Sequence, residues 1–447
     1  ESRGLGDVYK RQVLHFDFSV SKYITADMLS AVINRQLLLW EKIYQREEGE
    51  TTFSLRFEGI IRRAYKQTGK QVVVLIDEYD SPMLDSNHND EVQKEIRNIM
   101  RDFFSPLKAQ GQYLRFLLLT GISKFSQMSI FSELNNLQNI SMRDDYSAIC
   151  GITEQELRTQ LQIDIEQMAQ ANKETYEEAC VHLKQQYDGY HFSENSEDIY
   201  NPFSLFNAFA QKKYANFWFS TGTPTFLIDI LQESDFDIRE LDNTTATAEQ
   251  FDAPSNRITD PLPVLYQSGY LTIKGYDPDF QLYTLAYPNK EVRKGFIESL
   301  MPAYVHLPAR ENTFYVVSFI KDLRIGHLEE CLERLKSFFA SIPNKLNNKE
   351  EKHYQTIFYL FFRLMGQYID VEVDTAIGRA DAVVKLQDTI YVFEFKVDGT
   401  PEEALAQINS KGYAIPYQAD HRKIVKVGVN FDSATRTIGE WKIELGS

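Results

Sequence analysis

Three ionisable residues near the end of the chain have the types and the spacing for metal-dependent hydrolysis. Asp381 heads one apolar stretch, and Glu394 and Lys396 lie in the next, 13 residues on (394 − 381), a separation that a tight hairpin closes. Side chains two apart in a strand point to the same side. Two carboxylates can hold Mg²⁺, and a nearby lysine can orient water or stabilise charge on a phosphate. The pattern therefore predicts a hydrolytic metal site on a hairpin.

Residues on both flanks of this hairpin could complete the site. Glu351 begins an amphipathic helical stretch and could add a third acid. Gln407 and Lys411 lie one turn apart on the next helical stretch and so share a face. Plainer explanations stay open for each group. Glu394 and Lys396 also fit an exposed charge pattern on a half-solvated sheet. Glu351 also fits a solvated helix start, and Gln407 and Lys411 also fit the surface of a helix.

A second constellation lies where the apolar run 72–76 ends in two adjacent acids, Asp77 and Glu78. In a P-loop nucleotide hydrolase the first acid of such a pair holds the Mg²⁺ shell, and the second polarises the attacking water. Thr120 ends another apolar run, where a polar residue can report on a γ-phosphate, and Lys124 follows it. The alternatives are helix capping by the acids and a solvated loop around Lys124.

The phosphate-binding half of such a site is missing from the sequence, because no G-x-x-x-x-G-K-[ST] pattern occurs. In this type of ATPase the loop follows the first core strand, upstream of the strand expected at 13–18. Residues 1–12 have no helical or strand periodicity and no initiator Met, and they resemble a prefix found at the ends of metagenomic gene fragments. We expect them to be non-native and the N-terminus to be truncated; a disordered natural tail is the alternative.

Alternating strands and helices must position the acids of the second constellation. Apolar runs predict strands at 13–18, 72–76 and 114–120, and periodic stretches predict helices at 25–45, 54–68 and 90–110. In the first helix, the apolar stripe expected to face the core is Met28, Val32, Leu37 and Leu38. Strands that are apolar on both faces and alternate with helices predict a parallel α/β sheet.

Downstream, the pattern changes twice. Residues 151–305 are helical and rich in Tyr and Phe, with a hairpin expected near 273–285, which suits a small α+β or winged-helix-like lid. A helical connector at about 314–346 follows, and the last hundred residues read helix, three strands, helix, strand. The domains expected are a prefix (1–12), an ATPase-like core (13–150), a helical lid (151–305), a connector (306–350) and a nuclease-like domain (351–447).

Composition sets limits on what the chain can be. Apolar residues make up 43% and charged residues 25%, which is typical of a globular protein with ample core. No apolar run is long enough to span a bilayer, so no membrane partner is expected. The three cysteines lack metal-ligand spacing and favour a reducing, cytoplasmic location. The net charge of −16 argues against a surface coated for nucleic-acid binding, although it allows a local basic cleft.

Two resemblances follow from these residues. The acid, spacer and E-x-K pattern of Asp381, Glu394 and Lys396 resembles the PD-(D/E)XK nuclease superfamily, with Ala380 in place of the family's Pro. Four further stretches resemble AAA-ATPase-like proteins common in gut Bacteroidetes, which carry a nuclease-like domain at the C-terminus. These stretches are 72–83, 119–125, 200–204 and 217–222, and their order matches from residue 13 to the end.

The resemblance implies a fold, cofactors and partners. The fold is α/β, with a P-loop-type parallel sheet, a helical middle region and a C-terminal restriction-endonuclease-like domain. Asp77 and Glu78 match the Walker B positions of an ATP- and Mg²⁺-dependent bacterial ATPase, and the Walker A lysine has no counterpart. Asp381, Glu394 and Lys396 match the nuclease triad, with Glu351 as a further acid. DNA is expected as substrate rather than RNA, and a homo-oligomer stays open because such ATPases often form rings.

Two other functions remain as alternatives. The C-terminal domain could grip nucleic acid or a protein without catalysis while the ATPase acts as a nucleotide switch. The negative net charge favours this binder, because a nuclease needs an electropositive cleft. A general metabolic α/β enzyme ranks last, because the sequence has neither a glycine-rich dinucleotide fingerprint nor a Ser-His-Asp pattern.

Overall fold

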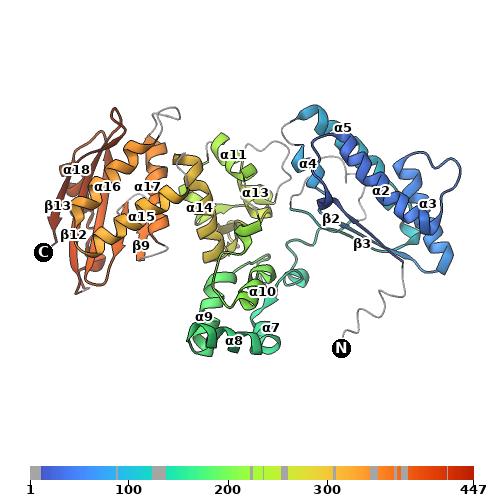
Figure 1. The fold of residues 1–447 in the computed structure, drawn as a ribbon, viewed down its shortest axis with the longest axis horizontal. Coiled ribbons are helices and arrows are strands. Elements are labelled where there is room, and N and C mark those ends of the chain that lie inside the picture. Colours follow the sequence, from blue (N-terminus) through green and yellow to red (C-terminus); the bar gives the residue numbers. More distant parts are fainter. Residues whose placement is uncertain are drawn as a thin grey trace. The chain divides into compact units, whose positions relative to one another are not determined.

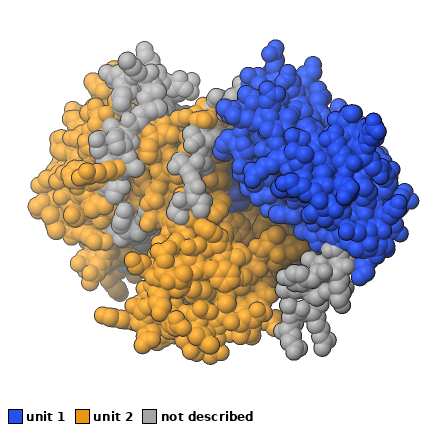
Figure 2. Space-filling model, turned by 45° about the vertical axis from the view of Figure 1, so that its right-hand side comes forward, with its two compact units in different colours: residues 1–146, 246–269 blue, residues 147–245, 270–447 orange. Residues whose placement is uncertain are grey.

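The computed structural model describes residues 12–86, 89–122, 137–221, 225–234, 236–252, 260–305, 309–342, 351–366, 370–373, 381–419 and 421–446. The chain divides into two compact units, residues 1–146 with 246–269 and residues 147–245 with 270–447, which Figure 2 shows in different colours. In this described part, no helix is both long and apolar enough to cross a membrane.

The first unit is built on a three-stranded parallel sheet, as the sequence predicts. Its strands, in spatial order, are β1 (Val13–Asp17), β2 (Val72–Asp77) and β3 (Leu114–Leu119). Its helices are α2 (Ala26–Tyr44), α3 (Phe53–Thr68), α4 (Ser81–Asp85), α5 (Asp90–Phe104), α6 (Pro106–Ala109), α12 (Ala248–Phe251) and α13 (Leu262–Gln267). Helices α2, α3 and α5 gather over one face of the sheet (Figure 1). Alternate β2 residues are accordingly buried.

Two expectations for this unit are wrong in detail. The single helix expected at 90–110 is divided between α5 and α6 at Pro106, which has no backbone N–H to continue the ladder. The stripe expected to face the core in α2 is right for Leu37, which is buried, and for Val32, which packs against the core, but wrong for Met28 and Leu38. Met28 and Leu38 are 40% and 46% exposed, and the fully buried residues are Leu29, Ile33 and Leu37.

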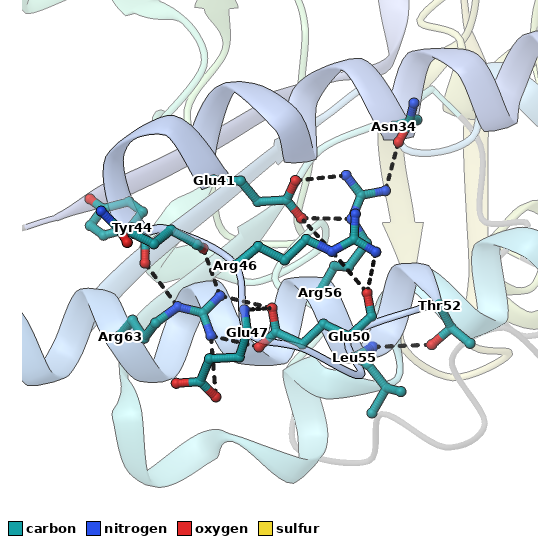
Figure 3. Close-up of polar contacts among 11 residues, drawn as sticks. Asn34, Glu41, Tyr44, Arg46, Glu47, Glu50, Thr52, Leu55, Arg56 and Arg63 are labelled. Atoms are coloured by element: carbon teal, nitrogen blue, oxygen red, sulfur yellow. Dashed lines mark hydrogen bonds and ion pairs between the residues drawn. The ribbon is translucent and has the colours of Figure 1, made fainter.

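A buried ionic network joins α2 to α3 (Figure 3). Arg56 of α3 donates from Nε and Nη2 to the Glu41 carboxylate of α2, at 2.7 and 3.0 Å, and from Nη1 to Asn34, at 2.6 Å. Arg63 holds Glu50, from the connecting loop, by two bonds of 2.6 and 3.0 Å. Both arginines are paired by planar, two-pronged contacts, so this network fixes the helices that cover the sheet.

The second unit begins with a helical region. It contains α7 (Glu154–Gln160), α8 (Gln162–Asn172), α9 (Tyr176–Tyr187), α10 (Pro202–Gln211), α11 (Thr225–Glu233) and α14 (Lys290–Val305). Its strands are β4 (Ile152–Thr153), β5 (Ile199–Tyr200), β6 (Thr244–Ala246), β7 (Thr272–Asp277) and β8 (Leu282–Ala286). The antiparallel pair β7–β8 confirms the hairpin expected at 273–285.

The unit ends in a five-stranded mixed sheet. The strands are β9 (Asp370–Val373), β10 (Ala382–Lys385), β11 (Thr389–Val397), β12 (Lys423–Asp432) and β13 (Thr437–Leu445). They lie in the order β13-β12-β11-β10-β9, and only β11 and β12 are parallel. The sequence predicts one strand after the last helix; the structure has two, β12 and β13.

Helices cover both faces of this sheet. On one face lies α18 (Pro401–Lys411), which crosses from β11 to the parallel strand β12. On the other, α17 (Glu351–Met365) packs Phe358 against Phe395, with ring centroids 4.1 Å apart. The expected connector is two helices, α15 (Ala309–Arg324) and α16 (Leu328–Ser341), divided at Gly326, whose φ of +79° favours glycine. Helix α16 packs against β13.

Candidate functional site

The hairpin β10–β11 brings Asp381 next to the strand that carries Glu394. Asp381 directly precedes β10, and its Oδ2 accepts a hydrogen bond of 2.8 Å from the backbone N–H of Phe395. Ala382 pairs with Phe393 in the antiparallel ladder. The separation of 13 residues (394 − 381) is therefore closed by one tight connection, as the spacing predicts.

Glu394 lies inside the domain. It is only 2% exposed, so the exposed charge pattern considered from the sequence is wrong for this residue. The even-numbered side chains of β11 face α18, where Val392 belongs to the same buried cluster as Leu405. The aromatic residues between them face α17 instead. Helices cover both faces of β11, so the Glu394 carboxylate lies in the interior and loses solvation free energy.

The two carboxyl groups interact and resist ionisation. Burial raises the pKa of the Glu394 carboxyl to about 7, and the nearby charge of Asp381 adds to the rise. Burial also raises the pKa of Asp381. The Oε2 atom of Glu394 has no hydrogen-bond partner among the described residues. Two such carboxyls with a free buried oxygen fit a cation, whose charge would stabilise both ionised forms.

Lys396 is held beside this pair by two acceptors. Its Nζ lies 3.0 Å from Glu394 Oε1 and 2.5 Å from Gln407 Oε1. Gln407 in turn donates from Nε2 to the hydroxyl of Tyr413, at 3.0 Å. Gln407 thus joins the site, whereas Lys411 is exposed on the same helix. The sequence analysis did not single out Tyr413. The signal that could have found it is a tyrosine just after the end of the helix that carries Gln407.

Glu351 is not brought into this site by anything the structure describes. It begins α17, but its side chain lies outside the described ones. Across the described residues, no three His, Cys, Asp or Glu side chains form a group that could hold a metal ion unaided. A cation bound by Asp381 and Glu394 would therefore need oxygens from water or from substrate, as Mg²⁺ commonly does.

The acids of the first unit gather at one edge of its sheet. Asp77 ends β2, and the hydroxyl of Thr120, just after β3, donates to its Oδ1. Asp17 ends β1 and pairs with Asp77 in the parallel register. The sequence analysis missed Asp17, although an acid at the end of a neighbouring parallel strand must lie at the same edge. Lys124 lies outside the described residues.

Glu78 has an unusual backbone and an acidic neighbourhood. Its φ is +51°, a left-handed conformation that is uncommon for a residue other than glycine. Burial raises the pKa of its carboxyl, and the charges of Asp80, Asp77 and Asp17 raise it further. The hydroxyl of Ser81 donates to Glu78 Oε2 at 3.4 Å. Strain and like charge at one residue are typical of functional sites.

Comparison with known proteins assigns the two ends of the chain. Residues 6–131 match the family model described as "Predicted AAA-ATPase", and residues 349–441 match that of the PD-(D/E)XK nuclease superfamily. The chain is 35% identical over 402 residues to an "Uncharacterized protein in vnfD 5'region" of Azotobacter chroococcum mcd 1, covering 87% of this chain and 75% of that protein. No solved structure matches. The chain belongs to the AAA-ATPase-like proteins that carry a C-terminal domain of the PD-(D/E)XK nuclease superfamily.

Proposed function

We propose that the C-terminal domain is a Mg²⁺-dependent nuclease that hydrolyses phosphodiester bonds, with DNA as substrate. The observation that carries the proposal is the buried Glu394 carboxyl, which lies against both Asp381 and Lys396 and has one oxygen without a partner in the part of the chain that the structure describes. Buried Glu291 and Asp188 also have an oxygen without a partner among the described residues, so what sets Glu394 apart is that a second carboxyl and an ammonium lie beside it.

Each residue of the site has a separate task. Asp381 and Glu394 would hold the metal, and Glu351 is retained as a further candidate ligand. Bound Mg²⁺ would supply stabilisation of the negative charge that develops on the phosphate. The Lys396 ammonium, fixed by Gln407, orients the attacking water and offsets charge at the same centre. The backbone N–H of Phe395 fixes the orientation of the Asp381 carboxylate.

The test is a Mg²⁺ titration of cleavage on single- and double-stranded DNA and RNA, with Glu394→Ala beside the parent. Glu444→Ala is the matched control, because Glu444 also pairs with a lysine, at 2.8 Å, but its side chain is 43% exposed on the edge strand β13. Metal-dependent cleavage that is lost only in Glu394→Ala supports the nuclease. If the parent binds DNA equally well in chelator and never cleaves it, the non-catalytic binder is the better description.

We also propose that the sheet edge of the first unit serves an ATP site. Asp77 would hold Mg²⁺, Glu78 would polarise water, and Thr120, which is bonded to Asp77, would respond to the γ-phosphate. Lys124 remains a candidate without a described position. ATP turnover would then gate the nuclease domain. Measuring ATP binding in Asp77→Asn against the parent tests this part; equal affinity in the two proteins would reject the role of Asp77.

We also propose the domain boundaries, the cellular location and a test of the oligomeric state. We place the domain boundaries at residues 13, 151, 306 and 351, and we assign the protein to the cytoplasm because Cys150, Cys180 and Cys331 are all free thiols. Size-exclusion chromatography with and without ATP tests whether the chain forms the homo-oligomer that stays open.

A further inference from the structure

Asn430 lies beside the lysine of the candidate site, on the neighbouring strand. In the parallel register of β11 and β12, Lys396 pairs with Asn430. Side chains at paired positions of adjacent strands point to the same face, so the Asn430 amide lies on the face that carries Glu394 and Lys396. The strands are held together one step further on, where the backbone N–H of Asp398 donates to the carbonyl oxygen of Phe431 at 2.8 Å.

A bulge in β13 accommodates the Asn430 side chain on its other side. The register between β12 and β13 shifts here, so that Asn430 lies opposite two residues, Gly439 and Glu440. A Cβ at Gly439 would lie 3.0 Å from Asn430 Nδ2, so the absence of a side chain there makes room for the amide. Nδ2 is the amide atom nearest to β13, and Oδ1 lies farther from that strand. Bulges of this kind commonly re-aim a side chain next to an active site.

The amide oxygen of Asn430 and the ammonium of Lys396 could satisfy one another. Oδ1 of Asn430 is buried and has no hydrogen-bond partner among the residues that the structure describes. An ammonium has three N–H donors. The described acceptors of Lys396 Nζ are Glu394 Oε1, at 3.0 Å, and Gln407 Oε1, at 2.5 Å. A buried acceptor without a partner costs free energy, and the third donor of its neighbour would remove that cost.

We propose that Asn430 is a positioning residue of the nuclease site: its Oδ1 accepts a hydrogen bond from the Lys396 ammonium when a divalent cation occupies the carboxyls of Asp381 and Glu394. The inference rests on the proposed nuclease function and deepens it. It identifies the residue that keeps the ammonium beside the reacting phosphate once the metal is bound.

The metal changes what can hold the ammonium. Without a cation, Lys396 offsets the charge of the Glu394 carboxylate, with Nζ 3.0 Å from Oε1. A divalent cation on the same carboxyl repels the ammonium and weakens that contact, because like charges at short range raise each other's free energy. Gln407 would then hold the ammonium from α18 alone, whereas Asn430 can hold it from the sheet as well.

The experiment measures Mg²⁺ affinity by isothermal titration calorimetry on the full chain, without nucleic acid. Asn430→Ala leaves the ammonium competing with the cation for Glu394, so Mg²⁺ binding is expected to weaken about tenfold. In a Lys396→Met background the same substitution should change the affinity by less than about twofold, because no ammonium is left to hold. A purely structural role of Asn430 would weaken binding equally in both backgrounds.

A matched control and a conservative variant separate this role from loss of fold. Asn409→Ala is the control, because Asn409 Oδ1 also accepts from a lysine, Lys426, at 2.7 Å; it should match the parent. Asn430→Asp keeps an acceptor of the same shape and should bind Mg²⁺ at least as tightly as the parent. Every protein carries Asp77→Asn, so that the acids of the first unit do not add a second Mg²⁺ site.

The inference and the nuclease are judged by different measurements. Equal losses of Mg²⁺ affinity in the two backgrounds, or no loss in either, would overturn the inference. Cleavage of DNA in Mg²⁺ by the parent, with Glu394→Ala beside it, is measured separately. If that cleavage is absent while the effect of Asn430→Ala depends on Lys396, the nuclease fails and the role of Asn430 in the metal site stands.

Discussion

Glu394 lies opposite Gly428 in the parallel register of β11 and β12. Side chains at paired positions point to the same face, so the absence of a side chain at Gly428 leaves room for α18 there. A Cβ at Gly428 would lie 2.3 Å from the carbonyl oxygen of Pro401 and 3.0 Å from Leu405 Cγ. Since α18 carries Gln407, this close approach delivers the acceptor that holds Lys396.

Gly428→Ala is therefore expected to damage both stability and the site. The clash is with backbone, which cannot rotate away, and overpacking of this kind costs roughly 1–3 kcal/mol. Urea unfolding measures the cost, and DNA cleavage in Mg²⁺ measures the effect on the site. Gly275→Ala is the control, because its nearest neighbour lies 3.7 Å away in another strand pair. Equal stability of the two variants would mean that α18 does not need its close approach.

The contact between Gln407 and Lys396 predicts a functional effect without a large loss of stability. Gln407→Ala frees the Lys396 amine from one of its two acceptors, and a loss of about tenfold or more in kcat is expected, with little change in KM. Lys411→Ala, an exposed change on the same helix, should leave kcat unaltered. A smaller loss is expected for Tyr413→Phe, which removes the acceptor of Gln407 Nε2. A change confined to KM would assign Gln407 to substrate binding instead.

The pKa of about 7 at Glu394 predicts how stability depends on pH in the absence of metal. At this carboxyl the folded state binds a proton more tightly than the unfolded state. The ionised carboxyl therefore lowers the free energy of unfolding as pH rises from about 4.5 through 7. Glu394→Gln should then stabilise the chain at pH 8 by on the order of 1–3 kcal/mol and have little effect at pH 4.

Urea unfolding in EDTA at the two pH values measures this difference, and Mg²⁺ supplies an independent check. Binding to the ionised carboxyls should raise the stability of the parent at pH 8 but not that of Glu394→Gln. A parent that is more stable at pH 8 than Glu394→Gln in EDTA would contradict the raised pKa. It would mean that the ion pair with Lys396 outweighs the burial of Glu394.

The C-terminal site was largely predictable because its spacing is local. A hairpin brings Asp381 to Glu394 whatever surrounds it, so residue types and a count of positions were sufficient. Burial was not predictable in the same way. The alternation around Glu394 fits a half-solvated sheet as well as a covered one, and only the position of α18 decides between them.

Contacts between segments far apart in the sequence could not be predicted, because they too depend on how the elements pack. Asp242 pairs with Arg363 of α17 although 121 residues separate them (363 − 242), and no period or motif links the two. Helix α2 shows the limit within one element: it has apolar residues on more than one side, so the pattern did not show which stripe is buried. The structure buries Leu29 and Ile33 and leaves Met28 and Leu38 partly exposed.

Glu78 gives the last prediction, because its backbone and its charge are both unfavourable. With φ at +51° and three acids nearby, Glu78→Asn should stabilise the first unit by about 1 kcal/mol, since asparagine tolerates the left-handed region and carries no charge. Lys173→Asn is the control, with φ at +58° but at a helix end outside the acidic cluster. It should give only the conformational part of the gain. Urea unfolding compares the two. A loss of stability in Glu78→Asn would mean that the Ser81 contact outweighs strain and repulsion, and that Glu78 is structural; a gain would mark an acid kept at a cost in stability, as the proposed water-polarising role requires.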